Sequence, residues 1–599
     1  MKKRPESAAQ IAAGDLDQMP TITNQAAARM LNRIAQLLEA KGESPFRVRA
    51  YREAAAQIEA MQTSVSALAR AGTLESIPGV GPSIAAKLSE YLKTGQCIYL
   101  AELQRTVPEG IECLMDVPGI GPARARLLAQ HLDVHTPEDL IQAAEAHRIR
   151  ELPGFGPRSE KQLLIEAQRW AQREHRLLLG IAWPIADQLI NLLRAEPVIE
   201  CISLGGSLRR MRETVGDLDI LAAAAVPEAA TKRFTELPIV REVLASGPTK
   251  VSVLLESGLQ VDLRVVEPSS WGAALQHFTG SKQHNIHLRD LAIARGLKLN
   301  EYGIYETATG RRIGGETEED VYHALNLEWI PPELREDRGE IQAASDHTLP
   351  ALVERGDLHG DLHVHTDWSD GKASIETMAE AAKGLDLDYI AITDHSKALT
   401  VAHGLNANRL RLQRQAIDEL NRKLAPFRIF TGAEVDILPD GSLDISSDVA
   451  KSLDYICVSV HSHFKMDRAQ MTQRIIRAIS HPFVNTLNHP TGRLIDKRPG
   501  YEVDLEAVLR CAAARRVAVE INSAIDRLDL DDVWARRAKD LGCRLVVNSD
   551  SHLPGGFQNL RFGVAVARRA WLSRRDLVNT LPQDGFVTWL QQARQPRAA

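Results

Sequence analysis

The sequence has few aromatic residues, 5% of the chain, and its six cysteines are scattered without a CxxC pair. This spacing argues against zinc fingers and is typical of reduced thiols in the cytoplasm. No apolar run approaches the roughly 18–20 residues that a membrane-spanning helix needs. Residues 1–20 carry basic side chains with no apolar stretch behind them, so we expect a disordered leader rather than a signal peptide. We therefore predict a cytoplasmic protein with no membrane partner.

The sequence also lacks an excess of basic residues, and its formal net charge is −6. This balance is only a weak argument against a nucleic-acid partner, since phosphate binding depends on local basic surface and on backbone amides. At about 150 residues per domain, a chain of 599 residues holds several domains. We expect it to act as a monomer.

A repeated turn marks the N-terminal part, where residues 21–100 show the apolar periodicity of helices. Segments 74–88, 114–128 and 149–164 each join two predicted helices through a Pro-Gly-x-Gly-Pro turn, which is an internal repeat. One such turn is usually only a tight turn, but repeated backbone N–H groups at helix starts favour phosphate. The segments resemble helix-hairpin-helix motifs, which grip the DNA backbone without reading bases. The predicted DNA contacts are Gly79, Gly81, Gly119, Gly121, Gly154 and Gly156.

Two aspartates, Asp217 and Asp219, lie two positions apart in a run that otherwise reads as a buried strand. Side chains two apart in a strand share a face, so the carboxylates repel unless a cation lies between them. Asp262 lies on the polar face of a later predicted strand. Three such carboxylates predict two Mg²⁺ or Mn²⁺ ions beside a phosphorylated substrate. The alternative is an exposed polar turn.

Ten of the 19 histidines lie after residue 356, where strand-like runs alternate with helices. Seven such units predict a distorted (β/α)7 barrel, whose functional groups converge at the C-terminal ends of the strands. The alternative of satisfied structural histidines applies to His359, His403, His463 and His481. Six further imidazoles and three carboxylates are too many ligands for one ion and predict two or three ions of Zn²⁺, Mn²⁺ or Fe²⁺. These ligands are His363, His365, Asp370, His395, Glu434, His461, His489, Asp550 and His552.

Four segments, 205–221, 261–266, 278–289 and 296–305, together resemble a family X DNA polymerase of the bacterial branch. The resemblance covers essentially the whole chain from about residue 21. It implies metal binding by Asp217, Asp219 and Asp262, with the primer 3′-hydroxyl activated near Asp262. It also implies that the incoming nucleotide contacts Gly206, Ser207, Arg210, Gly216, His277, Phe278, Gly280 and Asn285.

The same resemblance implies a division of the chain into domains after the leader. These are a helical 8-kDa-like DNA-binding domain over 21–100, helix-hairpin-helix fingers over 101–175, an α/β nucleotidyltransferase palm over 176–270, an α/β thumb over 271–335, a linker over 336–356 and the barrel over 357–599. The third glycine turn, at Phe155, either contacts DNA or only packs against the palm.

Two positions leave the chemistry open. Lys87 stands where polymerase-beta-like members use a Schiff-base lysine to remove 5′-deoxyribose phosphate, and Arg47 and Arg52 could supply the cationic surroundings that this chemistry needs. The alternative for Lys87 is a plain phosphate contact. His277-Phe278 replaces a Tyr-Phe pair of eukaryotic relatives that helps exclude the ribose 2′-hydroxyl, so sugar discrimination is an open question.

Segments 361–371, 392–396, 488–493 and 548–552 resemble a polymerase-and-histidinol-phosphatase (PHP) domain, with all nine ligand positions filled. This implies phosphoester hydrolysis at DNA ends, as a 3′–5′ exonuclease, a 3′-phosphatase or an enzyme that cleaves abasic sites. The whole chain is then a repair polymerase that fills gapped or nicked duplex DNA from dNTPs. The alternative is a hydrolase of a small phosphorylated substrate, with a polymerase half that only binds DNA.

Overall fold

The computed structural model describes residues 24–41, 43–61, 65–94, 97–100, 103, 114, 117, 119–172 and 176–593. The chain divides into two compact units, Met1–His175 and Arg176–Ala599. The leader predicted over 1–20 lies outside the described residues, as do residues 95–96, 101–102, 104–113 and 115–116 between the first two glycine turns.

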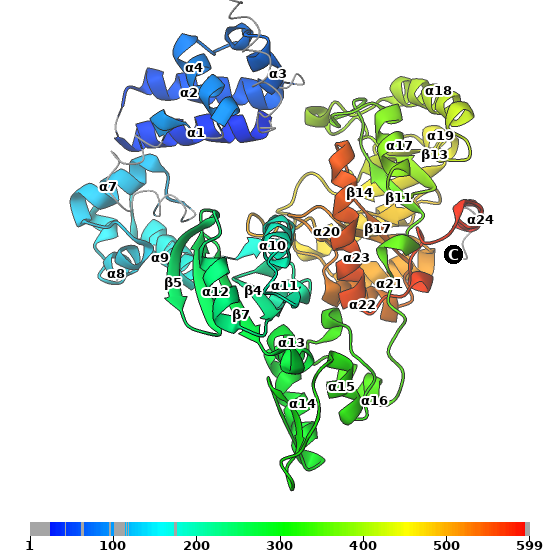
Figure 1. The fold of residues 1–599 in the computed structure, drawn as a ribbon. Helices are drawn as coiled ribbons and strands as arrows, with labels where there is room; N and C mark the ends of the chain where they lie inside the picture. The colour runs from blue at the N-terminus through cyan, green and yellow to red at the C-terminus, as the bar shows by residue number, and fades with distance from the viewer. Residues whose placement is uncertain are drawn as a thin grey trace, which may run out of the picture. The chain divides into compact units, whose positions relative to one another are not determined.

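The first unit is helical throughout its described residues, as predicted. Its α-helices are α1 (Asn24–Lys41), α2 (Pro45–Ala60), α3 (Val65–Arg70), α4 (Pro82–Thr94), α7 (Pro122–Leu132), α8 (Pro137–Glu145) and α9 (Pro157–Gln172) (Figure 1). Helix α1 buries Leu31, Ile34 and Leu38, which share one face at helical spacing. Helices α4, α7 and α9 each begin at the second proline of a glycine turn, because proline lacks the N–H that the first helical turn leaves unpaired.

Residues 176–270, predicted as the palm, contain a five-stranded sheet in the order β2-β4-β7-β6-β5. Its strands are β2 (Cys201–Leu204), β4 (Leu218–Ala223), β5 (Val240–Ser246), β6 (Lys250–Leu255) and β7 (Gln260–Val266), and its helices are α10 (Leu179–Arg194), α11 (Gly206–Arg209) and α12 (Pro227–Thr235). The short strands β1 (Leu177–Leu178) and β3 (Thr214–Val215) pair with each other and form a separate two-stranded sheet. In β4, Leu218 and Ile220 enter the core, as the period-2 pattern predicts. Strands β4 and β7 are parallel, and this pairing aligns the acidic residues.

The thumb combines helices with a small antiparallel sheet in the order β10-β9-β8. It contains α13 (Trp271–Thr279), α14 (Lys282–Ala294), β8 (Leu297–Asn300), β9 (Gly303–Glu306), β10 (Arg312–Gly314), α15 (Glu318–Ala324) and the 3₁₀ turn η4 (Pro332–Leu334). The stretch expected as a polar linker, 336–356, contains a further helix, α16 (Glu340–Ser345). Its Ile341 and Ala344 pack into the hydrophobic core of the thumb.

The C-terminal part is a seven-stranded parallel sheet whose order follows the chain from β11 to β17, which confirms the predicted fold class. Its strands are β11 (Gly360–Val364), β12 (Tyr389–Ile392), β13 (Arg428–Asp436), β14 (Tyr455–Ser459), β15 (Thr486–Leu487), β16 (Ala518–Asn522) and β17 (Leu545–Asn548). The barrel is nearly closed, because a parallel bridge joins Val364 to Ser551 and the Asn548 side chain accepts a hydrogen bond from the Leu362 amide.

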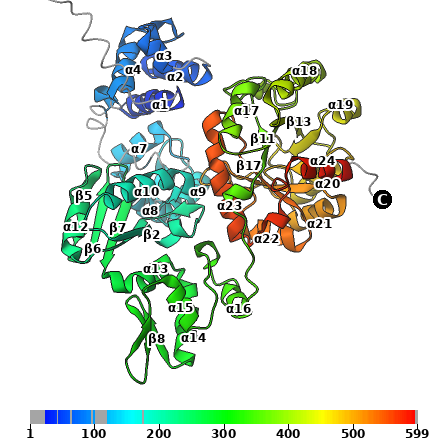
Figure 2. The same cartoon turned by 45° about the vertical axis from the view of Figure 1, so that its right-hand side comes forward.

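Helices surround this barrel on its outside (Figure 2). They are α17 (Ile375–Lys383), α18 (Ala407–Leu424), α19 (Ser447–Ser452), α20 (Arg468–Ile479), α21 (Leu505–Arg515), α22 (Asp532–Asp540) and α23 (Leu560–Arg569). Helix α24 (Gln583–Ala593) instead packs Phe586 against Tyr389 and Phe430, on the opposite face of the strands. The palm and the barrel share one hydrophobic core. At Gly180, near the start of α10, a Cβ would approach Ile525 of the barrel to 2.1 Å, so only glycine allows this close packing.

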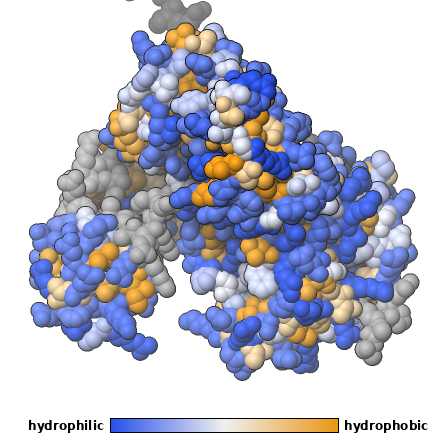
Figure 3. Space-filling view, turned by 90° about the horizontal axis from the view of Figure 1, so that it is seen from below, coloured by the Kyte–Doolittle hydropathy of each residue, from blue (hydrophilic) through white to orange (hydrophobic). Residues whose placement is uncertain are grey.

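None of the helices in the described residues combines the length and the apolar character that crossing a bilayer requires. On the face shown in Figure 3, hydrophobic residues occur in small groups among hydrophilic ones.

Candidate metal centres and nucleic-acid contacts

The C-terminal ends of the barrel strands bring nine acidic and histidine side chains together. Four overlapping groups each place one ligand atom per residue within 4.8 Å of the others. They are His365 with Asp370, His395 and His552; His363 with Glu434 and His489; His363 with His365 and Asp550; and His395 with Glu434 and His461. These are the nine residues that the sequence predicts as ligands, and they come from six of the seven strands or the loops that follow them.

Glu434 lies at the centre of this cluster and is 1% exposed. Its carboxylate oxygens lie 2.9 Å from His395 Nδ1 and 2.9 Å from His489 Nε2. Burial alone would raise its pKa, but the neighbouring histidines, His363 first, hold the pKa of Glu434 well below its usual range. The carboxylate therefore remains charged and available as a ligand.

Several imidazole nitrogens of the cluster are buried without a hydrogen-bond partner. They include His363 Nε2, both ring nitrogens of His365 and His489 Nδ1. Burial, followed by the nearby His552 and His395, lowers the pKa of His365 to about 3, so this ring is neutral at physiological pH. Buried polar atoms are normally paired, and the neutral ring of His365, with free lone pairs beside charged carboxylates, suits a divalent cation. Burial lowers the pKa of His363, but the carboxylates of Asp550, Glu520 and Glu434 raise it well above its usual value, so a metal ion bound there would displace a proton. The residues present therefore fit a multinuclear metal centre.

A further buried carboxylate, Glu520 on β16, supports this cluster and was not predicted from the sequence. It is 0% exposed and lies 2.8 Å from His363 Nδ1, while the backbone N–H of His489 donates to it at 2.7 Å. Such a partner fixes the orientation of a metal-ligating ring. Asp436 stands in the same relation to His461, at 3.1 Å from Nδ1. The available signal was a lone carboxylate inside an apolar strand, "VAVEIN".

The palm carboxylates are aligned by strand pairing. Asp219 on β4 and Asp262 on β7 are direct register partners, and Asp217 precedes Asp219 by two positions. Burial, then the charges of Asp217 and Asp262, raises the pKa of Asp219 to about 7. A carboxylate with this uncompensated repulsion fits a divalent cation. Among the described residues, the groups with ligand atoms all within 4.8 Å of one another do not include these three.

A lysine side chain, Lys250, pairs with one oxygen of Asp262. Its Nζ lies 2.6 Å from Asp262 Oδ2, and Gln260 donates to Asp262 Oδ1 at 3.1 Å. Burial raises the pKa of Asp262. The hydrogen bonds that it accepts, from Lys250 first, lower the pKa by more, so the net pKa is below its usual value. Sequence reasoning did not identify Lys250, because the pairing of β6 with β7 brings it near Asp262.

Gly206, which begins α11, lies directly against Asp219. Its φ is +54°, and a Cβ there would approach Asp219 Oδ2 to 1.9 Å, so this position requires glycine. The preceding Gly205 lies against both Asp219 and the backbone oxygen of Phe278, to which a Cβ would come within 3.2 Å. The Gly-Ser turn is therefore packed between the acidic strand and the end of α13.

Other residues predicted to contact the nucleotide surround this point. Arg210 donates to the backbone oxygen of Thr279 and to Glu336, and a Cβ at Gly280 would lie 3.2 Å from Arg210 Nη1. The guanidinium of Arg264 lies 4.5 Å from the centre of the Phe278 ring. Asn285 donates to the backbone oxygen of His277 at 2.7 Å. Ser207 is the second residue of α11, and Gly216 directly precedes Asp217.

The glycine turns of the first unit share one geometry. Gly79, Gly119 and Gly154 have φ values of +81°, +90° and +82°, which favour glycine. The second glycine of each turn, at Gly81, Gly121 and Gly156, has no atom within 4 Å of where a Cβ would lie. The turns at Gly81 and Gly121 therefore present open backbone at a helix start, as a phosphate contact needs, whereas the N–H of Gly156 already donates to Ser159 Oγ at 2.8 Å.

Phe155 of the third turn packs within its own unit, where the Arg124 guanidinium lies 5.2 Å from its ring centre.

Lys87 lies beside Tyr99, with Nζ 4.5 Å from the ring centre, and donates to Ser83 Oγ at 2.9 Å. Arg47 donates to the Tyr99 hydroxyl at 2.8 Å, so it shares this aromatic partner with Lys87. Arg52 pairs with Glu39 instead. Of the two predicted arginines, Arg47 is thus the one in the immediate surroundings of Lys87.

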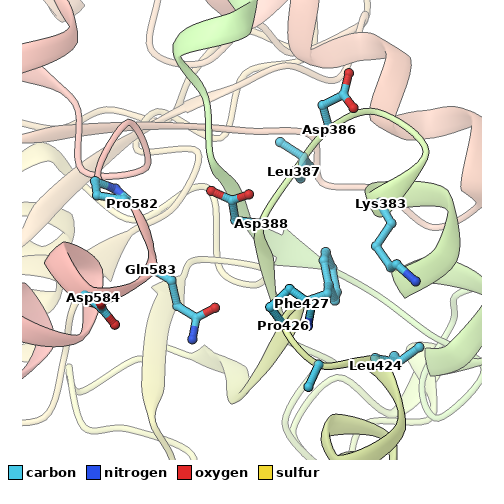
Figure 4. A pocket seen from close by; sticks show the side chains of 11 residues that line it. Lys383, Asp386, Leu387, Asp388, Leu424, Pro426, Phe427, Pro582, Gln583 and Asp584 are labelled. Carbon is cyan, nitrogen blue, oxygen red and sulfur yellow. The ribbon is translucent and has the colours of Figure 1, made fainter.

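A surface hollow of about 710 Å³ lies at the other end of the barrel. Its lining includes Asp388 and Phe427, which directly precede β12 and β13, together with Lys383, Gln583 and Asp584 (Figure 4). The metal-fitting cluster lies at the C-terminal ends of the strands, so this hollow is separate from it.

Comparisons with known proteins match four separate segments of the chain. Family models match residues 22–97 (helix-hairpin-helix domain), 111–169 (SAM-like helix-hairpin-helix tandem), 274–336 (DNA polymerase beta thumb) and 361–524 (PHP domain).

Curated relatives fall into two groups. The DNA polymerase/3′-5′ exonuclease PolX of Bacillus subtilis (strain 168) is 39% identical over 553 residues, which cover 92% of this chain and 96% of that protein. A probable phosphatase of Thermoanaerobacter sp. (strain X514) is 28% identical over 233 residues, 37% of this chain and 89% of that protein. A probable phosphatase of Shewanella sediminis is 27% identical over 243 residues, 39% of this chain and 93% of that protein. The chain therefore belongs to the bacterial family X DNA polymerases that carry a C-terminal PHP domain.

Proposed function

We propose that this protein is a DNA polymerase that fills short gaps in duplex DNA from dNTPs, and that its barrel hydrolyses phosphoesters at DNA 3′ ends. The name of the Bacillus relative, a DNA polymerase/3′-5′ exonuclease, supports both activities. The observation that carries the proposal is that one chain holds two separate acidic centres. One is the register pair Asp219 and Asp262 in the palm, and the other is the nine-residue cluster in the barrel.

In the palm, Asp217, Asp219 and Asp262 would hold two Mg²⁺ or Mn²⁺ ions, which supply charge neutralisation on the triphosphate and acidify the primer 3′-hydroxyl. Ser207 and Arg210 would bind the triphosphate, and Gly206 and Gly216 would allow the backbone to approach it. His277, Phe278, Gly280 and Asn285 would enclose the sugar and base. In this account Lys250 neutralises Asp262 until the carboxylate takes up a cation.

In the barrel, the nine clustered residues would hold two or three Zn²⁺, Mn²⁺ or Fe²⁺ ions, which supply Lewis-acid polarisation of the scissile phosphate. The neutral ring of His365 contributes lone pairs, while Glu434 and Asp550 contribute charge. Glu520 and Asp436 hold the rings of His363 and His461 in their ligating orientation. The 3′–5′ exonuclease, 3′-phosphatase and abasic-site activities all fit this centre.

The first unit would hold the duplex. The backbone at Gly79, Gly81, Gly119, Gly121, Gly154 and Gly156 would contact phosphates, which positions DNA without selecting sequence. Lys87 and Arg47 both contact Tyr99 and would bind the 5′ side of the gap. The role of Lys87 as a lyase nucleophile stays a prediction. The monomeric state and the cytoplasmic location also stay predictions.

The second candidate function is a phosphatase that acts on a small substrate, with a polymerase half that only binds DNA. The similarity of 37–39% of this chain to nearly the whole length of two probable phosphatases favours it. In that case the palm carboxylates would serve no synthesis, and the barrel would prefer a free phosphomonoester to a DNA end.

One assay separates the two candidates. The protein is incubated with a duplex that has a one-nucleotide gap and a labelled primer, with or without a 3′-phosphate, in Mg²⁺ or Mn²⁺, with or without dNTP. We expect the 3′-hydroxyl primer to grow by one nucleotide and to shorten when dNTP is omitted. The 3′-phosphorylated primer should lose its phosphate before it grows. Hydrolysis of p-nitrophenyl phosphate with neither growth nor trimming of the primer would favour the phosphatase.

A further inference from the structure

A line of alternating charges joins the palm to the barrel. Arg210 Nε donates to Glu336 Oε1 at 3.0 Å, and Arg569 Nη1 donates to the same oxygen at 3.0 Å. The other end of Arg569, Nη2, donates to Asp532 Oδ2 at 3.0 Å. Arg569 is the last residue of α23, and its side chain is 3% exposed. A buried arginine of the barrel thus shares its carboxylate partner with an arginine of the palm.

Arg569 also holds the main chain of the palm. Its Nη1 donates to the backbone oxygen of Arg210 at 2.8 Å. Both the backbone and the side chain of Arg210 are therefore fixed from outside the palm, the first by the barrel and the second by Glu336. The Nη1 of Arg210 further donates to the backbone oxygen of Thr279, which directly precedes Gly280.

From these contacts we propose that Arg569, supplied by the barrel, is a positioning residue for the nucleotide site of the palm. The inference rests on the proposed role of Arg210 in binding the triphosphate. Glu336 Oε1 is shared by the guanidinium groups of Arg210 and Arg569, with that of Arg212 at 4.0 Å, so the carboxylate neutralises Arg210 only in part and leaves it attraction for a phosphate. Without Arg569, Glu336 would pair with Arg210 more strongly, and the backbone at Arg210 would lose an anchor. Both changes weaken nucleotide binding and leave the reacting groups in place.

The neighbouring Arg568 provides a matched control. Its Nε donates to Glu333 Oε1 at 2.7 Å and its Nη1 to the backbone oxygen of Val353 at 3.1 Å. It therefore ties the barrel to the thumb and the connector without contact to Arg210 or Glu336. Arg568→Ala loses a comparable set of interdomain bonds, so it reports what general loosening of this interface does.

The experiment measures single-nucleotide gap filling by the full-length protein for wild type, Arg569→Ala, Arg569→Lys and Arg568→Ala. We expect Arg569→Ala to raise KM for dNTP about tenfold, with kcat within about twofold of wild type. Arg569→Lys should recover part of this loss, because an ammonium group can reach one of the acceptors but not all of them. Arg568→Ala should keep the wild-type KM. Adding Arg569→Ala to Glu336→Gln should raise KM by less than it does alone, because the two residues act through one contact.

Hydrolysis by the barrel and affinity for gapped DNA are measured alongside, and both should be unchanged in Arg569→Ala. Arg210→Ala is included to separate two kinds of failure. If Arg210→Ala raises KM but Arg569→Ala behaves like Arg568→Ala, the positioning role is wrong and the nucleotide site stands. If Arg210→Ala leaves KM unchanged, the proposed nucleotide site is wrong and the inference fails with it. Equal losses of gap filling, hydrolysis and DNA affinity in both Arg569 variants would show a merely structural role and overturn the proposal.

Discussion

Asp219 and Asp262 are direct partners on the parallel strands β4 and β7, so their carboxylates lie on the same face of the palm sheet. Gly206 closes this face from one side, because its backbone lies against Asp219 with no room for a Cβ. The arrangement keeps Asp219 half-buried among like charges, and its pKa rises to about 7. The protein therefore tolerates an unfavourable charge at a position where a cation would remove the repulsion.

Replacing Asp219 with asparagine should abolish synthesis and spare hydrolysis. The amide keeps the size of the side chain but loses the charge that holds a cation, so we expect kcat for gap filling to fall at least about 100-fold, or about 2.7 kcal/mol. Trimming of a 3′ end should stay within about twofold of wild type. The exposed Asp187, on α10, gives the control substitution Asp187→Asn. A parallel loss of both activities in a folded Asp219→Asn variant would contradict two independent centres.

The same variant should change how stability depends on pH in metal-free protein. The pKa of Asp219 rises from 3.8 to about 7 on folding, so the native state binds its proton more tightly than the unfolded state. Stability is therefore lost as pH rises from about 4 to about 7, by up to about 4 kcal/mol. In EDTA, Asp219→Asn should melt above wild type at pH 8 and at the same temperature near pH 4. Added Mg²⁺ should raise the melting temperature of wild type more than that of the variant.

His365→Ala should have the opposite selectivity. Both ring nitrogens of His365 are buried without a hydrogen-bond partner, and the ring belongs to two of the four ligand groups. We expect loss of 3′-end trimming and fewer bound metal ions per protein, with gap filling nearly intact. His403, an exposed histidine outside these groups, is the matched control, and His403→Ala should keep its metal content and both activities. Full metal content in His365→Ala would rule out His365 as a ligand.

Glu520→Gln should weaken metal binding in the barrel without removing a ligand. Glu520 lies 2.8 Å from His363 Nδ1 and accepts a hydrogen bond from the backbone of His489, so its loss frees two ligands to reorient. Loss of such a partner commonly costs about 10–100-fold in metal affinity. Titration of metal-free protein with Zn²⁺ or Mn²⁺ measures this directly. Glu506→Gln, at an ion pair on the barrel surface, should leave the affinity unchanged.

Much of the fold and many of the site residues could be predicted from the sequence, because the residues that suit the chemistry lie at positions that the local strand pattern also marks. Each barrel ligand lies near the end of an apolar strand or in the loop that follows it, and parallel strands bring such ends together. Asp217 and Asp219 were visible because the strand period is two. The connector was predicted less well, because α16 has only six residues and its burial depends on Ile341 fitting the thumb core.

Contacts between distant segments left no local signal. Lys250 reaches Asp262 only because β6 pairs with β7, and Glu520 reaches His363 across 157 positions of the chain. Arg569 and Arg210 are 359 positions apart. Each of these residues alone reads as an ordinary strand or helix residue. Their roles follow from the register of the sheet and the packing of the barrel on the palm, which one sequence does not encode as a motif.

We predict that His277 takes part in discrimination of the sugar of the incoming nucleotide. Its ring lies edge-on to Phe278, with ring centres 4.9 Å apart, and burial lowers its pKa, so it is neutral near pH 7. Tyrosine is longer and carries a hydroxyl, and at this position it would extend the side chain that lies beside Phe278. We expect His277→Tyr to lower kcat/KM for a ribonucleotide more than for the matching deoxynucleotide, by about 1.4 kcal/mol or tenfold in the ratio.

The measurement is kcat/KM for dNTP and rNTP opposite the same template base in a one-nucleotide gap. His287→Tyr, on the exposed side of α14 where His287 pairs with Asp337, makes the same substitution away from the site and should leave the ratio unchanged. Asn285 donates to the backbone oxygen of His277, so the backbone position is held independently of the ring that is replaced. A wild-type ratio in His277→Tyr would therefore mean that another side chain tests the 2′-hydroxyl, with Phe278 the first to examine.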